Sequence, residues 1–352
     1  MAVAALERQG AWLYRLGDMA PKPFSILFIT SSRLGDAVLS SGLVRTLAAE
    51  IPEALFTIVG SALTAPLFAD TPNLERLIVM DKQKRAGHWF GLWRQVRGRR
   101  WGLVVDLRGS GIAGALRPKR RAVHRKGGTP VHKVIEAARL LKMDSAPPSP
   151  FLFASPETEA RAAKLTAGPG PILAIGPAAN WVGKTWPVER FAQVARRLLA
   201  PSGPMAGGRL MVVGGPGDLA SCEPLRASVG RDNCIDLVGR ESLVVVYAAL
   251  KRARLYIGND SGLMHLAAAA GAPTLGLFGP SDESLYAPWG PKGRALRGTR
   301  TFEELRELDP NFSQAITHMM DLSADSVYGA AVALLDDTEE AEEAGRTQEA
   351  ET

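Results

Sequence analysis

Short apolar runs alternate with longer amphipathic stretches along most of the chain, a pattern that predicts buried strands joined by helices. In the first part of the sequence, such runs predict strands at residues 25–29, 55–59, 76–80 and 103–107. Apolar residues spaced by three and four positions between 38 and 47 predict a helix after the first strand. Strands that alternate with helices form a parallel, helix-covered sheet, so this part is predicted to be an α/β domain.

The same pattern begins again after a proline-rich segment. Residues 146–150 read Ala-Pro-Pro-Ser-Pro, which disfavours helix and makes a stiff connector, so we expect the interdomain linker there. A second series follows, with strands at 171–175 and 210–213 and a helix at 188–199. The sequence therefore predicts an N-terminal extension, two Rossmann-like domains and a tail, at residues 1–23, 24–150, 151–335 and 336–352.

Composition narrows the class of protein. A chain of 352 residues, 46% of them apolar, can build two globular cores. Its two cysteines, Cys222 and Cys234, fit neither a disulfide framework nor a metal cluster and suggest a reducing compartment. Glu7 and Arg8 interrupt any signal-peptide core in the extension, and no later segment is long and apolar enough to span a bilayer. We expect a cytoplasmic protein that is free in solution or held at a membrane surface.

The net charge of +6 is unevenly distributed. Residues 82–126 contain fourteen lysines and arginines and one acid, Asp106, whereas residues 336–352 contain eight acids and one arginine. The acidic tail is poor in apolar residues and is predicted to be disordered. The basic segment suits an anionic partner, which could be nucleic acid, anionic lipid or an acidic or phosphorylated acceptor. A solvated basic face without a partner is the alternative.

The stretch at residues 255–280 carries the strongest chemical signal. A buried strand ends before Asp260, Ser261 and Gly262, an alanine-rich helix containing His265 follows, and a second strand returns at 274–278. Asp260 or Ser261 suits the N-cap of that helix, and Gly262 allows a close approach of the backbone to a ligand. The positive N-terminal end of a helix at this edge can hold an anion such as a pyrophosphate. An ordinary strand–helix–strand corner with a capped helix is the alternative.

An earlier loop combines Arg33, Gly35 and Asp36 directly after the first predicted strand. Gly35 permits a tight turn, and Asp36 lies at the start of a helix. Asp36 could take a proton from a hydroxyl as a general base. It could also be an acidic residue that the helix dipole favours at this position.

Two loops of the second series carry further candidates. Lys184 lies on a glycine-bearing loop ahead of Trp186 and Pro187, where a cation suits a phosphate. The loop does not have P-loop spacing, so an ATPase is not indicated. Asp218 follows Gly-Gly-Pro-Gly and could accept hydrogen bonds from ribose hydroxyls. A glycine turn with a capping aspartate explains it equally well.

Taken in order, these motifs resemble glycosyltransferase family 9, the ADP-heptose:lipopolysaccharide heptosyltransferases and their relatives. The resemblance spans roughly residues 24–335 and rests on three motifs. They are Arg-Leu-Gly-Asp at 33–36, Lys-Thr-Trp-Pro at 184–187, and Asp-Ser-Gly-Leu-Met-His-Leu-Ala-Ala at 260–268 with Phe-Gly-Pro-Ser-Asp at 278–282. It implies a GT-B fold, in which two Rossmann-like doubly wound domains face a central cleft, with the acceptor mainly on the first and the nucleotide sugar mainly on the second.

The resemblance also implies a reaction, an inverting transfer without a required metal or cofactor. Its donor would be a nucleotide sugar such as ADP-heptose, and its acceptor an anionic glycolipid of the lipopolysaccharide core or a related glycan. Asp36 would be the catalytic base, with Arg33 and Gly35 on the acceptor side. The donor-binding residues would be Lys184, Asp218, Asp260, Ser261, Gly262 and His265.

Two departures from the family pattern bear on the substrate. Gly42 replaces a usual proline, and residues 178–180 lack the usual hydroxyls. These departures affect the expectation that the transferred sugar is heptose more than the expectation that the protein transfers a sugar. The alternatives are a GT-B-like nucleotide-sugar epimerase and a non-catalytic module that binds nucleotide sugar or nucleic acid. We expect no nucleic-acid partner, and expect that the basic segment can contact the anionic inner face of a membrane.

Overall fold

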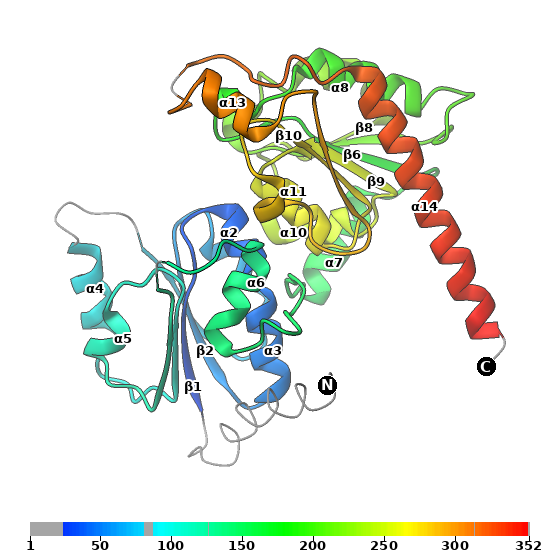
Figure 1. Ribbon diagram of the computed structural model, residues 1–352. Coiled ribbons are helices and arrows are strands. Elements are labelled where there is room, and N and C mark those ends of the chain that lie inside the picture. Colours follow the sequence, from blue (N-terminus) through cyan, green and yellow to red (C-terminus); the bar gives the residue numbers. More distant parts are fainter. Residues whose placement is uncertain (1–23, 81–86, 126, 313, 351–352) are drawn as a thin grey trace. The chain divides into compact units, whose positions relative to one another are not determined.

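The computed structural model describes residues 24–80, 87–125, 127–312 and 314–350, so the extension at residues 1–23 lies outside it. The chain forms two compact units that divide between Ser155 and Pro156 (Figure 1). Each unit is built on a parallel β-sheet with helices on its faces. The predicted α/β class is therefore confirmed.

The first unit has a five-stranded sheet in the order β3-β2-β1-β4-β5, and every neighbouring pair is parallel. Helices α3 and α6 lie on one side of this sheet, and α4 and α5 lie on the other (Figure 1). Its strands are β1 (Ser25–Ile29), β2 (Leu55–Gly60), β3 (Leu74–Val79), β4 (Leu103–Asp106) and β5 (Arg120–Val123). Its helices are α2 (Leu34–Leu39), α3 (Gly42–Glu50), η1 (Ala65–Phe68), α4 (Gly87–Val96), α5 (Ile112–Ala115), α6 (Lys133–Ala138) and η3 (Arg139–Leu141).

The helix predicted across residues 38–47 is two helices, α2 and α3. Two serines separate them, and both hydroxyls donate to carbonyls of the preceding turn. Ser40 Oγ lies 2.8 Å from the oxygen of Asp36, and Ser41 Oγ lies 2.6 Å from that of Val38. Such bonds compete with the backbone hydrogen bonds of a helix, so the chain turns at this point. The short α2 that results carries Asp36 in its first turn.

The proline-rich segment at residues 146–150 packs against the first unit. Phe151 N donates to Ser41 Oγ at 2.9 Å, and Ser155 N donates to Asp70 Oδ2 at 2.7 Å. A Cβ atom on Gly42 would lie 2.4 Å from the oxygen of Ser149, so only glycine fits beneath this segment. These contacts explain why the compact units divide after Ser155, and why residue 42 departs from the proline of the family pattern.

The second unit has a six-stranded parallel sheet in the order β11-β10-β9-β6-β7-β8. Its strands are β6 (Ile172–Gly176), β7 (Arg209–Val212), β8 (Cys234–Asp236), β9 (Leu255–Asn259), β10 (Thr274–Phe278) and β11 (Gly293–Arg297). Its helices are α7 (Pro156–Leu165), η4 (Val182–Lys184), α8 (Val188–Leu198), η5 (Pro216–Asp218), α9 (Glu223–Ala227), η6 (Arg231–Asn233), α10 (Leu243–Leu250), α11 (Gly262–Ala269), α12 (Glu283–Tyr286), α13 (Phe302–Leu308) and α14 (Ala324–Ala350).

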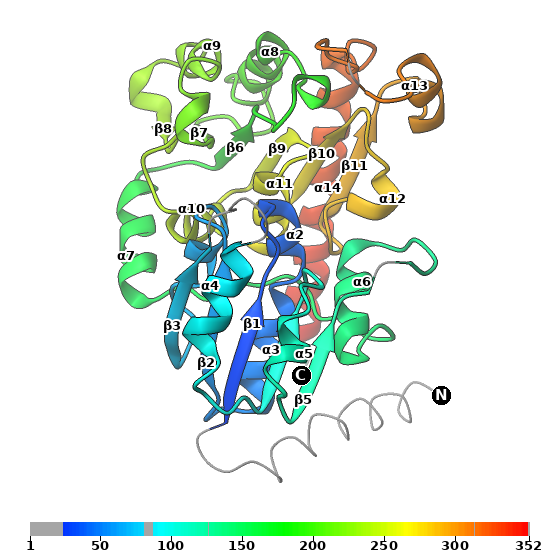
Figure 2. The same cartoon turned by 90° about the vertical axis from the view of Figure 1, so that its left-hand side faces the viewer.

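Residues 336–350, which were expected to be disordered, instead continue α14. This helix packs against α8 and runs behind β9, β10 and β11 (Figure 2). Basic residues of the second unit hold the acidic stretch: Arg254 pairs with Glu339 at 2.7 Å, and Lys292 pairs with Glu342 at 3.0 Å. The acidic charge is thus partly neutralised within the unit, which offsets the repulsion that suggested disorder.

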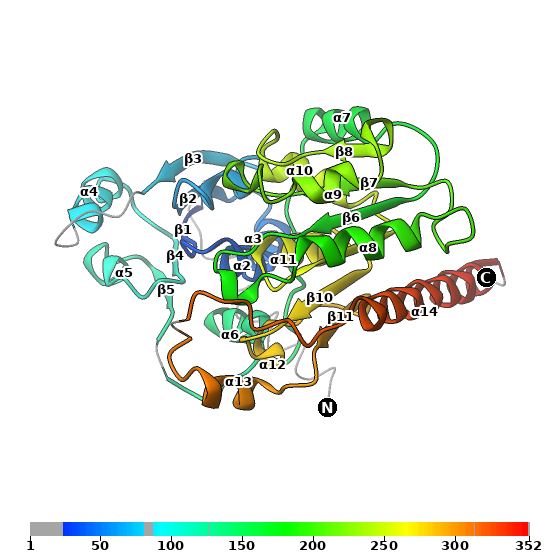
Figure 3. The ribbon, with the colours of Figure 1, turned by 90° about the horizontal axis from the view of Figure 1, so that it is seen from above.

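In each sheet, successive strands are added first in one direction and then in the other, and two loops lie at the point where the direction reverses. In the first unit this point lies between β1 and β4, and in the second it lies between β6 and β9. On the far side of β9, β10 and β11 lie side by side at the edge of the second sheet (Figure 3). In open parallel sheets, ligands bind beyond the carboxyl ends of the strands at such switch points. The loops after β1, β4, β6 and β9 are therefore the places to look for a site. None of the helices in the described ranges is both long and apolar enough to cross a bilayer.

Candidate functional site

Lys184 and Asp260 meet at the switch point of the second unit. Lys184 comes from the loop after β6 and Asp260 from the loop after β9, and Lys184 Nζ lies 2.6 Å from Asp260 Oδ2. Asp260 is almost completely buried, whereas about a quarter of the Lys184 side chain is exposed. The carboxylate thereby fixes the ammonium group of a side chain that is still partly open to solvent.

Asn259 connects the same two loops through its buried amide. Its Oδ1 accepts a hydrogen bond from Trp186 N at 3.1 Å, and its Nδ2 donates to the oxygen of Pro177 at 2.6 Å. Trp186 is itself fully buried and packs edge-on against Phe191 in α8. Asn259 thus fixes both ends of the loop that carries Lys184. Asn259 was not among the residues predicted to form the site.

The N-terminus of α11 lies next to Asp260. Ser261 occupies the N-cap position but makes no capping hydrogen bond with its side chain, and Gly262 is the first residue of the helix. His265 is buried one turn later, with Nε2 3.9 Å from Asp260 Oδ1. Five predicted donor residues are therefore brought together here, and the helix adds the positive end of its dipole to the charge of Lys184. These five are Lys184, Asp260, Ser261, Gly262 and His265.

A segment near residues 317–322 supports the lysine loop from outside. Thr317 Oγ1 donates to the oxygen of Thr185 at 2.7 Å, His318 N donates to that of Gly183 at 3.1 Å, and Trp186 Nε1 donates to that of Leu322 at 2.9 Å. Sequence reasoning missed this segment, because it follows no predicted strand and matches no motif.

Asp218 lies apart from this cluster, on the loop after β7. Its Oδ2 accepts a hydrogen bond from Gly215 N at 2.8 Å, so the carboxylate folds back onto its own glycine turn. This is the capping arrangement that the sequence left open as the alternative. The side chain is only half-buried, and its role toward a ribose stays a prediction.

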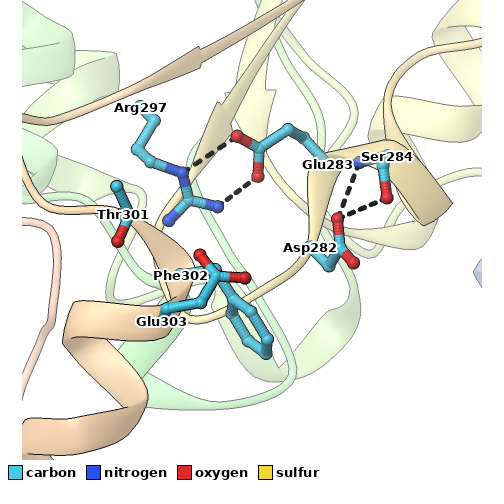
Figure 4. Close-up of a pocket in the computed structure, with 7 residues that line it drawn as sticks. All are labelled: Asp282, Glu283, Ser284, Arg297, Thr301, Phe302 and Glu303. Carbon is cyan, nitrogen blue, oxygen red and sulfur yellow. Dashed lines mark hydrogen bonds and ion pairs between the residues drawn. The ribbon is translucent and has the colours of Figure 1, made fainter.

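Arg297 of β11 braces the last part of the family motif. Its guanidinium donates to the oxygens of Gly279 and Ser281, both at 2.5 Å, and pairs with the Glu283 carboxylate. This contact lowers the pKa of Glu283. A pocket of about 260 Å³ opens beside the pair and is lined by Asp282, Glu283, Ser284, Arg297, Thr301, Phe302 and Glu303 (Figure 4). None of the predicted site residues lines it, and its acids outnumber its single arginine, so it does not suit an anion.

Asp36 lies at the corresponding edge of the first unit, after β1. Burial raises the pKa of its carboxyl, and the positive charges of Arg33 and Lys133 oppose that shift. Ser31 Oγ lies 3.5 Å from Asp36 Oδ2, which is a weak contact. A carboxylate whose pKa is raised, and whose contact with Ser31 is weak, is suited to accept a proton from a hydroxyl.

The residues next to Asp36 in the sequence differ in their roles from the other acid at this edge of the sheet, Asp106. Arg33 is exposed and Gly35 half-buried, so both remain accessible beside the carboxylate. Asp106, at the end of β4, is fully buried and accepts hydrogen bonds from Ser110 N at 2.8 Å and Ser110 Oγ at 2.7 Å. Asp106 therefore shapes its own loop and is no candidate for the base.

The basic segment forms a partly aromatic surface. Phe90 of α4 is 62% exposed, and three arginines in the ten residues that follow it, Arg94, Arg97 and Arg100, are exposed as well. Trp101, in contrast, is core: it is 4% exposed and donates through Nε1 to the oxygen of Val96. The basic residues Lys82, Lys84, Arg85 and Lys126 lie outside the described residues.

The described residues support neither nucleophilic catalysis by a cysteine nor a site for a metal ion. Burial raises the pKa of both Cys222 and Cys234 to about 11, so neither thiol is an activated nucleophile. Across the described ranges, no three His, Cys, Asp or Glu side chains come together in a way that could hold a metal ion. The predicted independence of a metal remains a prediction.

Comparison with known proteins gives one family. A family model described as glycosyltransferase family 9 (heptosyltransferase) matches residues 90–311. Lipopolysaccharide heptosyltransferase 2 of Salmonella typhimurium is 24% identical over 327 residues, which are 81% of this chain and 91% of the relative. Lipooligosaccharide heptosyltransferase 2 of Haemophilus influenzae is 25% identical over 311 residues, 78% and 88% of the two chains.

Solved structures agree with these relatives. ADP-heptose lipopolysaccharide heptosyltransferase II of Escherichia coli has a TM-score of 0.70 at 22% identity, over 90% of this chain and all of that one. A family 9 glycosyltransferase of Veillonella parvula has a TM-score of 0.73 at 20% identity, over 91% and 99% of the two chains. These likenesses confirm the predicted GT-B fold class.

The role of Asn259 can be tested directly. In Asn259→Ala, Trp186 N–H and Pro177 C=O lose their partners inside the protein, which should cost about 2 kcal/mol or more of unfolding free energy. We expect the Trp186 amide to exchange with solvent deuterium much faster, beyond the change in global stability. Asn180→Ala, an exposed asparagine on the same loop, is the matched control. Unchanged protection of the Trp186 amide in Asn259→Ala would contradict this role.

Proposed function

Because the chain belongs to glycosyltransferase family 9, we propose that it transfers a heptose from ADP-heptose to a hydroxyl of the lipopolysaccharide core or a related glycan. The observation that carries the proposal is the Lys184–Asp260 pair beside the N-terminus of α11. An ammonium and a helix N-terminus together suit a diphosphate. The names of the relatives, which are lipopolysaccharide and lipooligosaccharide heptosyltransferases, support the sugar and the acceptor.

The proposed reaction is a single displacement. The acceptor oxygen forms a bond to the anomeric carbon of the sugar while the bond from that carbon to the diphosphate oxygen breaks, which inverts the configuration. Asp36 accepts the proton of the acceptor hydroxyl. Lys184 and the N–H groups at the start of α11 stabilise the negative charge that develops on the departing nucleoside diphosphate.

The remaining predicted residues complete the donor side of the proposal. His265, next to Asp260, contacts the sugar or the diphosphate, and Asp218 contacts the ribose once its hydrogen bond to Gly215 is shared or released. On the acceptor side, Arg33 attracts an anionic glycolipid toward Asp36. No metal ion takes part, because the cationic groups of the chain supply the charge that a metal would otherwise provide.

The donor can be identified by thermal shift with ADP, UDP, GDP, CDP and ADP-heptose. A ligand that binds only the folded protein stabilises it by about 2.7 kcal/mol at one hundred times its Kd. We expect ADP and ADP-heptose to raise the Tm selectively, Lys184→Ala to lose most of that shift, and Lys164→Ala, an exposed lysine of α7, to keep it. A Tm shift with another nucleotide instead would mean that the donor is a different nucleotide sugar. The absence of a Tm shift with every ligand tested would overturn the proposal.

Asp36→Asn tests the base. Loss of the general base should lower turnover by about 10²- to 10⁴-fold while ADP-heptose affinity persists. In the wild type, kcat/KM should fall on the acid side through an apparent pKa above that of an ordinary aspartate, because burial raises the pKa of Asp36 and only the ionised form accepts a proton. The residual activity of Asp36→Asn should not show this fall of kcat/KM at acid pH.

The same shift in pKa predicts the stability of the variant. Burial raises the pKa of Asp36 above its unfolded value, so the folded state disfavours the charge, and ionisation lowers stability as the pH rises through that range. Asp36→Asn should therefore fold with an equal or higher Tm at pH 7. Asp144→Asn, which changes an exposed carboxylate of the first unit, is the control. Wild-type turnover in Asp36→Asn would remove Asp36 as the base.

The α4 surface, which we define as Phe90, Arg94, Arg97 and Arg100, supports a membrane contact. An exposed aromatic ring beside three exposed cations suits the surface of an anionic bilayer, where each basic residue contributes about 1 kcal/mol. We propose that it holds the enzyme at the cytoplasmic face of the membrane, where a lipid-linked acceptor is presented.

Flotation with liposomes tests this contact. The wild type should float with anionic liposomes and not with neutral ones, and less so as salt increases. Arg94→Ala/Arg97→Ala/Arg100→Ala should lose the binding, whereas Lys164→Ala/Arg196→Ala/Arg306→Ala, three exposed cations of the second unit, should keep it. Equal flotation with neutral and anionic liposomes would count against the proposal.

A further inference from the structure

Three glycines form a row across the centre of the second sheet. Gly176 of β6 pairs in register with Gly258 of β9, which in turn pairs with Gly276 of β10. None of the three has a φ angle in the left-handed region, so backbone conformation does not require glycine there. Residues in register on neighbouring parallel strands share a face of the sheet. The row therefore leaves a slot on that face without any Cβ atom.

Two side chains fill this slot. Tyr256, two residues before Gly258 on the same strand, points along the same face, and Met264 comes from α11. A Cβ atom on Gly176 would lie 2.2 Å from the Tyr256 hydroxyl, and one on Gly276 would lie 2.3 Å from Met264 Sδ. The glycines thus give the phenol a path toward the carboxyl edge of the sheet. Without this row, the hydroxyl of Tyr256 could not lie where it does.

The Tyr256 hydroxyl ends beside Ser261. Tyr256 is fully buried, and the side chain of Ser261 contacts its phenol, a contact that lowers the pKa of the phenol and so opposes the effect of burial. Burial is the larger effect and raises the pKa of Tyr256 well above its ordinary value, so the phenol keeps its proton. Tyr256 therefore offers an O–H donor to the first turn of α11 at any physiological pH.

Neither hydroxyl is satisfied by the described part of the chain. Tyr256 OH and Ser261 Oγ are both shielded from solvent, and neither makes a well-formed hydrogen bond to a described residue, because the contact between the two falls short of one. Ser261 stands at the N-cap of α11 and yet does not cap it. Unsatisfied buried hydroxyls destabilise a protein, which makes two adjacent ones at a helix N-terminus unusual. An anionic oxygen at that terminus would complete a chain from phenol to serine to ligand.

We propose that Tyr256 is a positioning residue for the donor diphosphate, which holds the Ser261 hydroxyl so that it donates to a phosphate oxygen. In the bound state, Tyr256 O–H donates to Ser261 Oγ, and Ser261 O–H donates to the phosphate. No bond other than hydrogen bonds forms or breaks. The inference rests on the proposed function, because it takes the N-terminus of α11 as the diphosphate site.

The simpler role for Tyr256 is to fill the glycine slot. Phenylalanine would fill it equally well and would remove one unsatisfied hydroxyl, so this role predicts that Tyr256→Phe is stabilising and has no effect on binding. The positioning role predicts that the same variant binds a diphosphate more weakly even though the unliganded protein is no less stable. In Tyr256→Phe, a loss of affinity for the diphosphate without a loss of stability is therefore expected only if the Tyr256 hydroxyl contributes to ligand binding.

Calorimetric titration with ADP and with inorganic pyrophosphate separates these roles. We expect Tyr256→Phe to lose roughly three- to tenfold in affinity for both probes, and Ser261→Ala to lose at least as much. The double variant should bind no more weakly than Ser261→Ala alone, because removal of the serine already breaks the chain. The Tm of unliganded Tyr256→Phe should equal or exceed that of the wild type.

Tyr247→Phe is the matched control. Its hydroxyl is also attached to a buried ring but donates to the oxygen of Ala269 at 3.4 Å, at the opposite end of α11. It should leave both affinities unchanged. Wild-type affinity in Tyr256→Phe, or independent effects of Tyr256→Phe and Ser261→Ala, would overturn the inference alone. A wild-type protein that binds neither probe would overturn the proposed function and the inference with it.

Discussion

The buried amide of Asn259 is the constraint on which the candidate site of the second unit depends. The loop between β6 and α8 is mostly irregular, and its course is fixed where Asn259 binds the oxygen of Pro177 near one end and the amide of Trp186 near the other. Since Asn259 is the last residue of β9, the sheet itself sets the position of that loop. The meeting of Lys184 with Asp260, the residue after Asn259, follows from this arrangement, and the segment near residues 317–322 supports the loop from outside.

The two units share a sheet topology and use it for opposite electrostatic tasks. In the second unit, the switch point gathers positive groups, an ammonium and a helix N-terminus, and one carboxylate orients the ammonium. In the first unit, the switch point holds Asp36 in a setting where burial outweighs the nearby positive charges and favours the proton. A diphosphate needs fixed positive charge, whereas a base needs a carboxylate that is only weakly satisfied. The division of roles therefore lies in the loops, because the two sheets are alike.

The sequence predicted the central strands and the edge strand β3, but it missed the edge strands β5, β8 and β11. Strands buried on both faces appear as apolar runs, and β1, β6, β9 and β10 were found for that reason. The edge strand β5 reads Arg-Arg-Ala-Val and β11 reads Gly-Arg-Ala-Leu-Arg, so solvent exposure removes the apolar signal, and neither was predicted. The acidic end of α14 was misjudged for a related reason, since ion pairs with residues far away in the sequence decide its state.

The candidate site was predictable only as far as local spacing reaches. Glycines and charges after predicted strands identified Lys184 and Asp260, because each motif is continuous in the sequence. The glycine row could not be found this way, since Gly176, Gly258 and Gly276 align only once the register of three strands is known. Read along the chain, each glycine weakens a strand, and Tyr256 resembles any core aromatic residue. In the folded sheet, the same residues form one slot that carries a hydroxyl to the edge where α11 begins, and this placement is the physical basis of the role that we propose for Tyr256.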